Sequence, residues 1–126
     1  MMELSVIIRV RDDIRIADCL DSIDEDVEVV IVLNTPSAQV KKILKRYDIK
    51  ITEINDNNLA KAYNKGIKVS RHKNVLLMDS DCIFSPGTIS KLYKGLKAAP
   101  LSKGRVIFKY SGIISKIIAE SREYHV

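Results

Sequence analysis

The sequence has few cysteines and no long apolar segment. Its 126 residues include two cysteines, two histidines and no tryptophan. Cys19 and Cys82 are far apart, so they match neither the spacing of a metal site nor a disulfide framework. No apolar run approaches the roughly 18 residues of a membrane span, and the N-terminus lacks the basic segment and apolar region of a signal peptide. These absences favour a reducing, cytoplasmic setting.

Several motifs of common enzyme classes are also missing. No Gly-x-Gly-x-x-Gly follows the first apolar segment, which argues against a dinucleotide-binding enzyme. No Gly-x-x-x-x-Gly-Lys-Ser/Thr is present, which argues against a P-loop NTPase. No Ser/His/Asp or Cys/His grouping for nucleophilic catalysis can be assembled, and His72 and His125 are expected at the surface. The chemistry therefore has to come from other residues.

The composition is that of a soluble globular domain with an uneven charge. Hydrophobic residues make up 46% of the chain and charged residues 29%. Residues 1–60 hold eight Lys/Arg and twelve Asp/Glu, a balance of −4, whereas residues 61–126 hold thirteen and four, a balance of +9. A basic half suggests an anionic partner such as a nucleotide or a phospholipid surface. No basic stripe is interleaved with aromatic residues, so nucleic acid is not expected as a partner.

Segments typical of strands and helices alternate along the chain. The expected strands are Leu4–Val10, Glu28–Leu33, Ile49–Ile54, Asn74–Met78 and Arg105–Tyr110. The expected helices are Ile16–Asp24, one capped by Thr35 before Pro36, Leu59–Val69, one capped by Ser85 before Pro86, and one containing Ile113 to Ile118. This alternation predicts a single α/β domain, residues 1–126, with a doubly wound, mostly parallel sheet and helices on both faces.

Gly66 lies inside the helix expected at Leu59–Val69. A glycine there costs about 1 kcal/mol relative to alanine. It indicates either a close approach of the backbone to another part of the chain or an early break in the helix.

The strand expected at Asn74–Met78 leads directly into two aspartates, Asp79 and Asp81. Aspartate is a poor strand residue and is costly to bury without a partner. In open α/β sheets, ligands bind in the crevice outside the carboxyl ends of the strands. Two carboxylates there suit Mg²⁺ or Mn²⁺, held together with the phosphates of a substrate. The alternative is that the two aspartates only cap a turn or the next helix.

Other polar residues are expected at the same edge of the sheet. Asp12 and Asp13 follow the first strand, and Asn34 ends the second. The helix that contains Asn64 and Lys65 begins on the same side. Each residue alone is more often a cap or a turn residue, but together they predict a cleft suited to a sugar nucleotide and its metal.

Five segments together resemble the N-terminal half of a family 2 glycosyltransferase, the inverting group with the GT-A fold. They are Ser5–Ile8, Cys19–Ile23, Val29–Asn34, Ala60–Ile67, and Val75–Cys82 followed by Ser85-Pro86-Gly87. The resemblance covers roughly residues 4 to 110, and the last two segments are its most specific part. It implies that the chain binds a nucleotide-diphosphate sugar, such as a UDP-sugar, for transfer of the sugar to an acceptor hydroxyl.

The resemblance also implies a role for each candidate residue. Asp12 or Asp13 would line the nucleotide site, Asn34 would face the base, Asn64 would support the diphosphate region, Asp79 would contact the ribose or the metal, and Asp81 would hold the divalent cation. The family generally has aspartate where this chain has Asn34, so the choice of base is open.

One part of the family pattern is not matched. The catalytic base of the family is an acidic residue well beyond the metal-binding acids, in an acceptor-binding half. After Asp81 the chain has only Glu120 and Glu123, both in the last expected helix. The acceptor-binding half is therefore expected to be absent, and transfer is expected to be weak unless a partner completes the site.

Two other functions are alternatives to sugar transfer. A non-catalytic nucleotide-sugar-binding or structural relative would need no catalytic base, which agrees with its absence. A receiver-like signalling domain fits the length and the Asp12-Asp13 pair, but a receiver's phosphate-accepting aspartate ends the third strand, and Asp79 ends the fourth. The isoleucines from Ile113 to Ile118 could cover the sheet, pair with a second copy of the chain or lie on a membrane. The sugar, the acceptor and the oligomeric state are left open by the sequence.

Overall fold

The computed structural model describes residues 2–96. The chain divides into two compact units, residues 1–89 and residues 90–126. The strand expected at Arg105–Tyr110, the helix containing Ile113 to Ile118, and the acids Glu120 and Glu123 lie outside the described residues.

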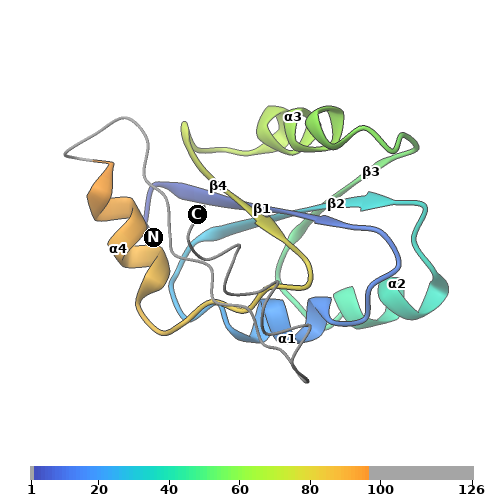
Figure 1. The fold of residues 1–126 in the computed structure, drawn as a ribbon, viewed down its shortest axis with the longest axis horizontal. Coiled ribbons are helices and arrows are strands. Elements are labelled where there is room, and N and C mark those ends of the chain that lie inside the picture. The colour runs from blue at the N-terminus through green and yellow to red at the C-terminus, as the bar shows by residue number, and fades with distance from the viewer. Residues whose placement is uncertain (1, 97–126) are drawn as a thin grey trace, which may run out of the picture. The chain divides into compact units, whose positions relative to one another are not determined.

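A four-stranded parallel sheet forms the centre of the first unit. Its strands are β1 (Leu4–Val10), β2 (Glu28–Asn34), β3 (Lys50–Ile54) and β4 (Asn74–Asp79), in the order β3-β2-β1-β4 (Figure 1). The bounds agree with the sequence prediction to within one residue at each end. Because every strand runs in the same direction, all four carboxyl ends lie at one edge of the sheet.

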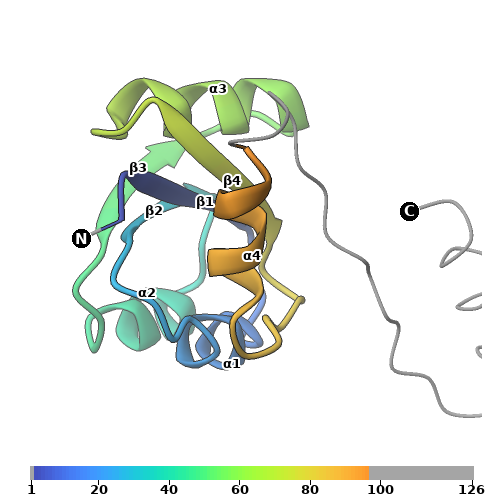
Figure 2. The same ribbon diagram turned by 90° about the vertical axis from the view of Figure 1, so that its left-hand side faces the viewer.

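Helices cover both faces of this sheet, as predicted. Helices α1 (Ile16–Asp21) and α2 (Ala38–Leu44) lie on one face, and α3 (Leu59–Val69) lies on the other (Figures 1 and 2). The central strands β1 and β2 are buried almost throughout, because each is covered on both faces. These findings confirm the doubly wound α/β prediction. No helix among residues 2–96 is long and apolar enough to cross a membrane.

Helix α3 packs tightly against the sheet at Gly66. A Cβ atom at this position would clash with Cγ2 of Ile7 and would lie 3.0 Å from Cγ2 of Val32. The helix continues through Gly66 to Val69 without a break. Of the two explanations that the sequence offered for this glycine, the close approach is the correct one.

The expected start of α2 was wrong. The N-cap is Ser37, whose Oγ accepts a hydrogen bond from the Val40 backbone N–H at 3.2 Å. Thr35 instead adopts a left-handed backbone conformation with φ of 44°, and Pro36 lies outside the helix. An N-cap side chain accepts from an N–H two or three residues after it, and Ser37 meets that condition for a helix beginning at Ala38.

The expected start of the next helix was also wrong. Helix α4 (Thr88–Gly95) begins later than Ser85 and Pro86 suggested. Gly87 has φ of 76°, which is incompatible with a right-handed helix, so no helix can run through it. The Thr88 backbone N–H donates to the Ser85 carbonyl at 3.1 Å, so Ser85 and Pro86 belong to a turn that precedes the helix.

Three further expectations about burial and length were wrong. The apolar run Asn74–Met78 predicts a buried strand, but the residues of β4 are half-buried or exposed, and Leu77 is 45% exposed. Among residues 2–96, β4 pairs only with β1, so one of its edges has no neighbouring strand there. The helical spacing of Leu59, Ala62, Tyr63 and Ile67 predicts that all four lie on the apolar face of α3, but Leu59 and Ile67 are exposed. Helix α1 ends at Asp21, three residues before the predicted end.

A buried carboxylate closes the opposite, amino-terminal edge of the sheet. Glu28, at the start of β2, accepts hydrogen bonds of 2.8 Å from the Ser5 hydroxyl, the Arg71 backbone N–H and the Arg71 guanidinium. Lys50 Nζ lies 3.5 Å from the same carboxylate. Burial alone would raise the pKa of Glu28, but these partners outweigh it and lower the pKa to about 2. This cluster stabilises the fold and lies at the opposite ends of the strands from the carboxyl edge.

Candidate functional site

Polar residues from three strands meet at the carboxyl edge of the sheet, and the pleat divides them between its two faces. Ile7 and Val32 face α3, because both would touch a Cβ at Gly66. Side chains alternate along a strand, so Arg9 and Asn34 face α3 as well. Asp79 lies opposite Arg9 in the β1–β4 register and shares that face.

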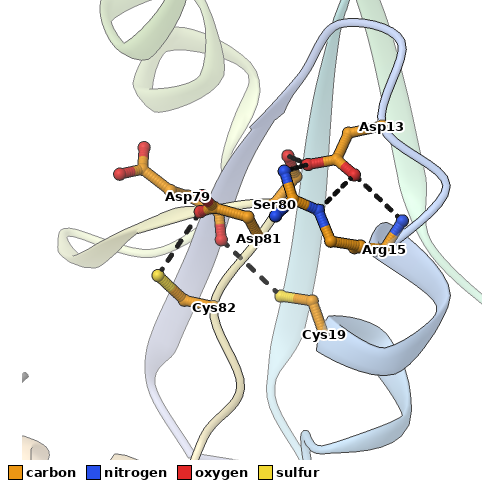
Figure 3. A network of polar contacts seen from close by, with 7 residues as sticks. All are labelled: Asp13, Arg15, Cys19, Asp79, Ser80, Asp81 and Cys82. Carbon is orange, nitrogen blue, oxygen red and sulfur yellow. Dashed lines mark hydrogen bonds and ion pairs between the residues drawn. The ribbon is translucent and has the colours of Figure 1, made fainter. Parts of the chain in front are cut away.

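The α1 side of the edge holds an ion pair tied to the turn after β4 (Figure 3). The Arg15 guanidinium donates to both carboxylate oxygens of Asp13, at 2.9 and 3.1 Å. The Ser80 hydroxyl, which is buried, donates to Asp13 Oδ2 at 3.2 Å. The hydrogen bond from Arg15 holds the pKa of Asp13 below its usual value, against the effect of partial burial. Asp13 is therefore a carboxylate with fixed internal partners.

Asp81 lies beside this ion pair and is exposed to solvent. Asp13 is the main cause of a raised Arg15 pKa, and the negative charge of Asp81 adds to it, so Arg15 provides positive charge to both acids. The Cys82 thiol donates a weak hydrogen bond to Asp81 Oδ1 at 3.5 Å (Figure 3). The Asp81 carboxylate thus remains accessible to a ligand.

The two cysteines are free thiols with raised pKa values, Cys19 buried and Cys82 half-buried. Burial raises the pKa of Cys19 to about 12, and burial together with the Asp81 charge raises the pKa of Cys82 to about 11. The Cys19 thiol points at the Asp79 carbonyl at 3.9 Å. Because the thiolate is the nucleophilic form, neither residue is a candidate nucleophile.

On the α3 side, Tyr63 anchors the Asp79 carboxylate. The Tyr63 hydroxyl lies 3.0 Å from Asp79 Oδ1 and 3.2 Å from the Met78 carbonyl, and it donates toward both acceptors. Burial first, and then the charge of Asp79, raise the pKa of Tyr63 above its usual value. The hydroxyl therefore stays protonated and orients Asp79, whose carboxylate is otherwise exposed.

Asn34 is buried at the end of β2 and is engaged within the protein. Its side-chain amide donates to the Asp56 carbonyl at 2.8 Å and to Asn57 Oδ1 at 3.3 Å. These bonds fix the loop that leads into α3, where Asn58 caps the helix by accepting from the Lys61 N–H at 3.1 Å. A shallow hollow of about 270 Å³ is lined by the two residues that follow Asn34 in the chain, Thr35 and Pro36, and by Glu53, Ile54 and Asn55.

The structure thus brings only some of the predicted residues together. Asp13 and the Asp79–Asp81 segment are joined through Ser80. Asn34 is directed at the loop before α3, and Asp12 is exposed next to Asp13. Asn64 is exposed on α3, whereas Ala62 and Gly66 of the same helix face the sheet.

A divalent metal fits this donor set only together with a ligand. Among residues 2–96, no group of three or more His, Cys, Asp or Glu side chains is placed to hold a metal ion. Asp79 and Asp81 nevertheless offer two exposed carboxylates at one strand end. That arrangement fits Mg²⁺ or Mn²⁺ bound by one or two carboxylates and completed by phosphate oxygens and water.

Four residues of the site were not predicted from the sequence. Arg15, Ser80 and Tyr63 contact the predicted acids directly, and Arg9 lies opposite Asp79 in the sheet. The helical spacing of Tyr63 predicts only a place on the apolar face of its helix. A usable signal was present for Arg9, because it is a lone charged residue inside an apolar strand.

Comparisons with known proteins agree with the fold. The sequence model of the family described as Glycosyl transferase family 2 matches residues 6–115. Two solved structures, both from S. aureus, are similar: TarS residues 1–349, with a TM-score of 0.68, and TarS, with a TM-score of 0.67. Each is 24% identical and matches 77% of this chain.

The matched region is 33% of the first TarS chain and 20% of the second, so this chain spans a third or less of either neighbour. No curated protein sequence matches the chain. The structural likeness shows the GT-A fold, and the family match extends over most of the sequence. The chain belongs to glycosyltransferase family 2.

Proposed function

We propose that the carboxyl edge of this sheet binds a nucleotide-diphosphate sugar, a UDP-sugar in the first instance, together with Mg²⁺ or Mn²⁺. The sugar would be transferred to an acceptor hydroxyl. The observation that carries the proposal is the pair of exposed carboxylates, Asp79 and Asp81, at the end of β4, with Ser80 between them held against Asp13. Membership of family 2 supports glycosyl transfer as the reaction.

Some residues of the site would bind the metal, and others position those residues. Asp79 and Asp81 would hold the cation, which when bound stabilises the charge of the departing nucleoside diphosphate. Tyr63 orients Asp79 by its 3.0 Å hydrogen bond. Ser80 and Asp13 hold the turn that contains Asp81.

Other polar residues of the site would contact the nucleotide. Asp12 or Asp13 would line the nucleotide site, and Asn64 would support the region of the diphosphate. Asn34 would contact the base through its Oδ1, because its amide N–H groups donate to the loop before α3.

A second candidate function is nucleotide-sugar binding without transfer. Between Asp81 and Glu120 the sequence contains no aspartate or glutamate, so no carboxylate in residues 82–96 can activate an acceptor hydroxyl. Inversion by direct displacement needs such a general base. In this alternative, the site binds the nucleotide sugar, and transfer requires a general base that residues 82–96 do not supply.

The test is a thermal unfolding series with UDP, GDP and UDP-sugars, each with and without Mn²⁺. Ligand at a hundred times its dissociation constant adds about 2.7 kcal/mol, a shift of several degrees for a domain of this size. We expect a metal-dependent shift with UDP in the wild type and none in Asp81→Ala. Asp48→Ala, an exposed carboxylate in the turn before β3, is the matched control and should behave like the wild type.

The same samples separate the two candidate functions. Release of free sugar or a glycosylated product from a UDP-sugar would support transfer, whereas UDP binding without turnover would support the binding-only alternative. If no nucleotide shifts the unfolding of the folded wild-type protein, the proposed donor site is wrong.

A further inference from the structure

Arg9 is a charged residue in the central strand of the sheet, close to the ligand edge. It is the second-last residue of β1, whose other residues are all buried. In the register it lies between Val32 of β2 and Asp79 of β4. Its side chain therefore faces α3, in the same row as the Asp79 carboxylate that is proposed to hold the metal.

The Arg9 side chain has a donor without an acceptor. Its Nε atom is buried and has no hydrogen-bond partner within the described part of the chain. Leaving a buried donor unpaired destabilises a protein, and the effect is larger for a charged group. Asp79 is the nearest acid by register, but its Oδ1 accepts from Tyr63, and the ion pairs found within residues 2–96 do not include Arg9.

The register places Arg9 beside a pair of residues that are already joined. Asp79 is its neighbour on β4, and the Tyr63 hydroxyl binds the Asp79 carboxylate at 3.0 Å. Arg9, Tyr63 and Asp79 therefore form one cluster at the carboxyl end of β1 and β4. A stability role does not account for an unpaired, partly desolvated cation there, because an apolar side chain of similar size avoids the cost.

We infer that Arg9 binds the nucleotide sugar: its guanidinium donates hydrogen bonds to acceptor oxygens of the nucleoside diphosphate. This inference rests on the proposed function and adds a binding residue to it. A guanidinium presents five N–H donors in a planar fork, which suits phosphate oxygens and the carbonyl oxygens of a base. The ligand would supply the acceptor that Nε lacks, and it would meet Arg9 and the metal-binding acids on adjacent strands.

The experiment measures binding by isothermal titration calorimetry on the full chain with Mg²⁺ present. The variants are Arg9→Met, which keeps the length of the side chain, and Arg9→Lys, which keeps the charge but not the Nε donor. The probes are UDP, uridine and inorganic pyrophosphate. Arg46→Met, an exposed arginine after α2, is the matched control.

We expect Arg9→Met to weaken UDP binding by at least tenfold, Arg9→Lys to weaken it less, and Arg46→Met to leave it unchanged. The melting temperature of ligand-free Arg9→Met should equal or exceed that of the wild type, because the variant removes an unpaired buried donor. If Arg9→Met loses as much affinity for uridine as for UDP, the oxygen that Arg9 binds is on the nucleoside. If it loses affinity for UDP and pyrophosphate but not for uridine, that oxygen is on the phosphates.

Two results would overturn the inference while leaving the proposed function intact. One is UDP binding by Arg9→Met that is as tight as wild type. The other is a fall of several degrees in the ligand-free melting temperature that Arg9→Lys restores, which would make Arg9 a structural residue. If the wild-type chain itself fails to bind UDP, with or without metal, the proposed function fails first and the inference fails with it.

Discussion

The Ser80 hydroxyl donates to Asp13 Oδ2 at 3.2 Å and so joins the loop after β4 to the loop after β1, 67 residues apart in sequence. The bond fixes the residue between Asp79 and Asp81. It therefore controls how the two exposed carboxylates are presented, although Ser80 itself is buried.

Replacing Ser80 by alanine should loosen this turn. Asp13 keeps its bonds to Arg15, so we expect a loss of about 1 kcal/mol in the free energy of unfolding, the size of one hydrogen bond. Urea denaturation measures it, and the metal-dependent shift with UDP should also decrease. Ser85→Ala, an exposed serine in the next turn, should change neither quantity. Equal stability of Ser80→Ala and wild type would show that the bond does not hold the turn.

Replacing Tyr63 by phenylalanine should weaken metal-dependent binding. The variant removes the hydroxyl that orients Asp79, and loss of a group that orients a metal ligand typically lowers metal affinity by about 10- to 100-fold. The Mn²⁺ concentration needed for the UDP-dependent thermal shift should rise accordingly.

Tyr47 offers a matched control for this prediction. Its hydroxyl also binds an aspartate, Asp21 Oδ1 at 2.7 Å, but on α1 and away from the ends of the strands. Tyr47→Phe should leave the Mn²⁺ dependence unchanged. If both phenylalanine variants shift it equally, the effect is one of general stability and Tyr63 does not orient a metal ligand.

Replacing Gly66 by alanine should destabilise the fold. The new methyl group would clash with Ile7 and press on Val32, and overpacking of this kind costs about 1–3 kcal/mol. The better helix propensity of alanine returns at most about 1 kcal/mol. We therefore expect a net loss in urea denaturation, whereas Lys68→Ala on the exposed side of α3 should be nearly neutral. A stabilised Gly66→Ala would mean that α3 does not approach the sheet so closely.

Much of this architecture could be predicted because apolar periodicity determines it. Strand β1 and helix α3 have the predicted bounds, since an unbroken apolar run and a helical repeat leave few alternatives. The starts of α2 and α4 could not be predicted in the same way. They depend on backbone dihedral angles at Thr35 and Gly87, which residue type alone does not fix.

Part of the site could likewise be predicted from the sequence, and part could not. Asp79 and Asp81 could be recognised as candidates because carboxylates at the end of an apolar strand are unusual. Their partners were not, since Tyr63 and Ser80 acquire their roles from contacts across 16 and 67 residues of sequence. The internal engagement of Asn34 was likewise invisible, because it depends on a loop 22 residues away.

Replacing Thr35 by glycine should stabilise the protein. Thr35 has φ of 44°, and a β-branched residue in this left-handed region is strained. Removing the strain should gain about 1 kcal/mol, less the greater backbone entropy of glycine in the unfolded chain. Thermal unfolding should show a higher midpoint for Thr35→Gly, with Ala38→Gly in the first turn of α2 as a destabilised comparison. A lower midpoint for Thr35→Gly would show that the backbone there is not strained.

The Glu28 cluster should make stability depend on acidity. Burial opposes ionisation of Glu28, but Arg71, Ser5 and Lys50 together lower its folded-state pKa from the ordinary 4.5 to about 2. A group whose pKa is lowered by folding stabilises the protein above its unfolded-state pKa. That contribution, about 3 kcal/mol by linkage, is complete at neutral pH and is lost as the pH falls from about 4.5 to about 2.

Urea unfolding of the wild type and Glu28→Gln at pH 7 and at pH 3 tests whether the ionised Glu28 carboxylate is the source of this stability. Glutamine keeps an acceptor for Ser5 but leaves Arg71 and Lys50 without their carboxylate, so the variant should be less stable at pH 7. The difference should narrow at pH 3, because the wild-type chain then loses part of the same contribution on protonation. Glu53→Gln, whose ion pair with Lys41 is exposed on both sides, should lie close to wild type at pH 7. A gap between Glu28→Gln and wild type that stays constant with pH would mean that the ionised carboxylate of Glu28 is not what holds this edge of the sheet together.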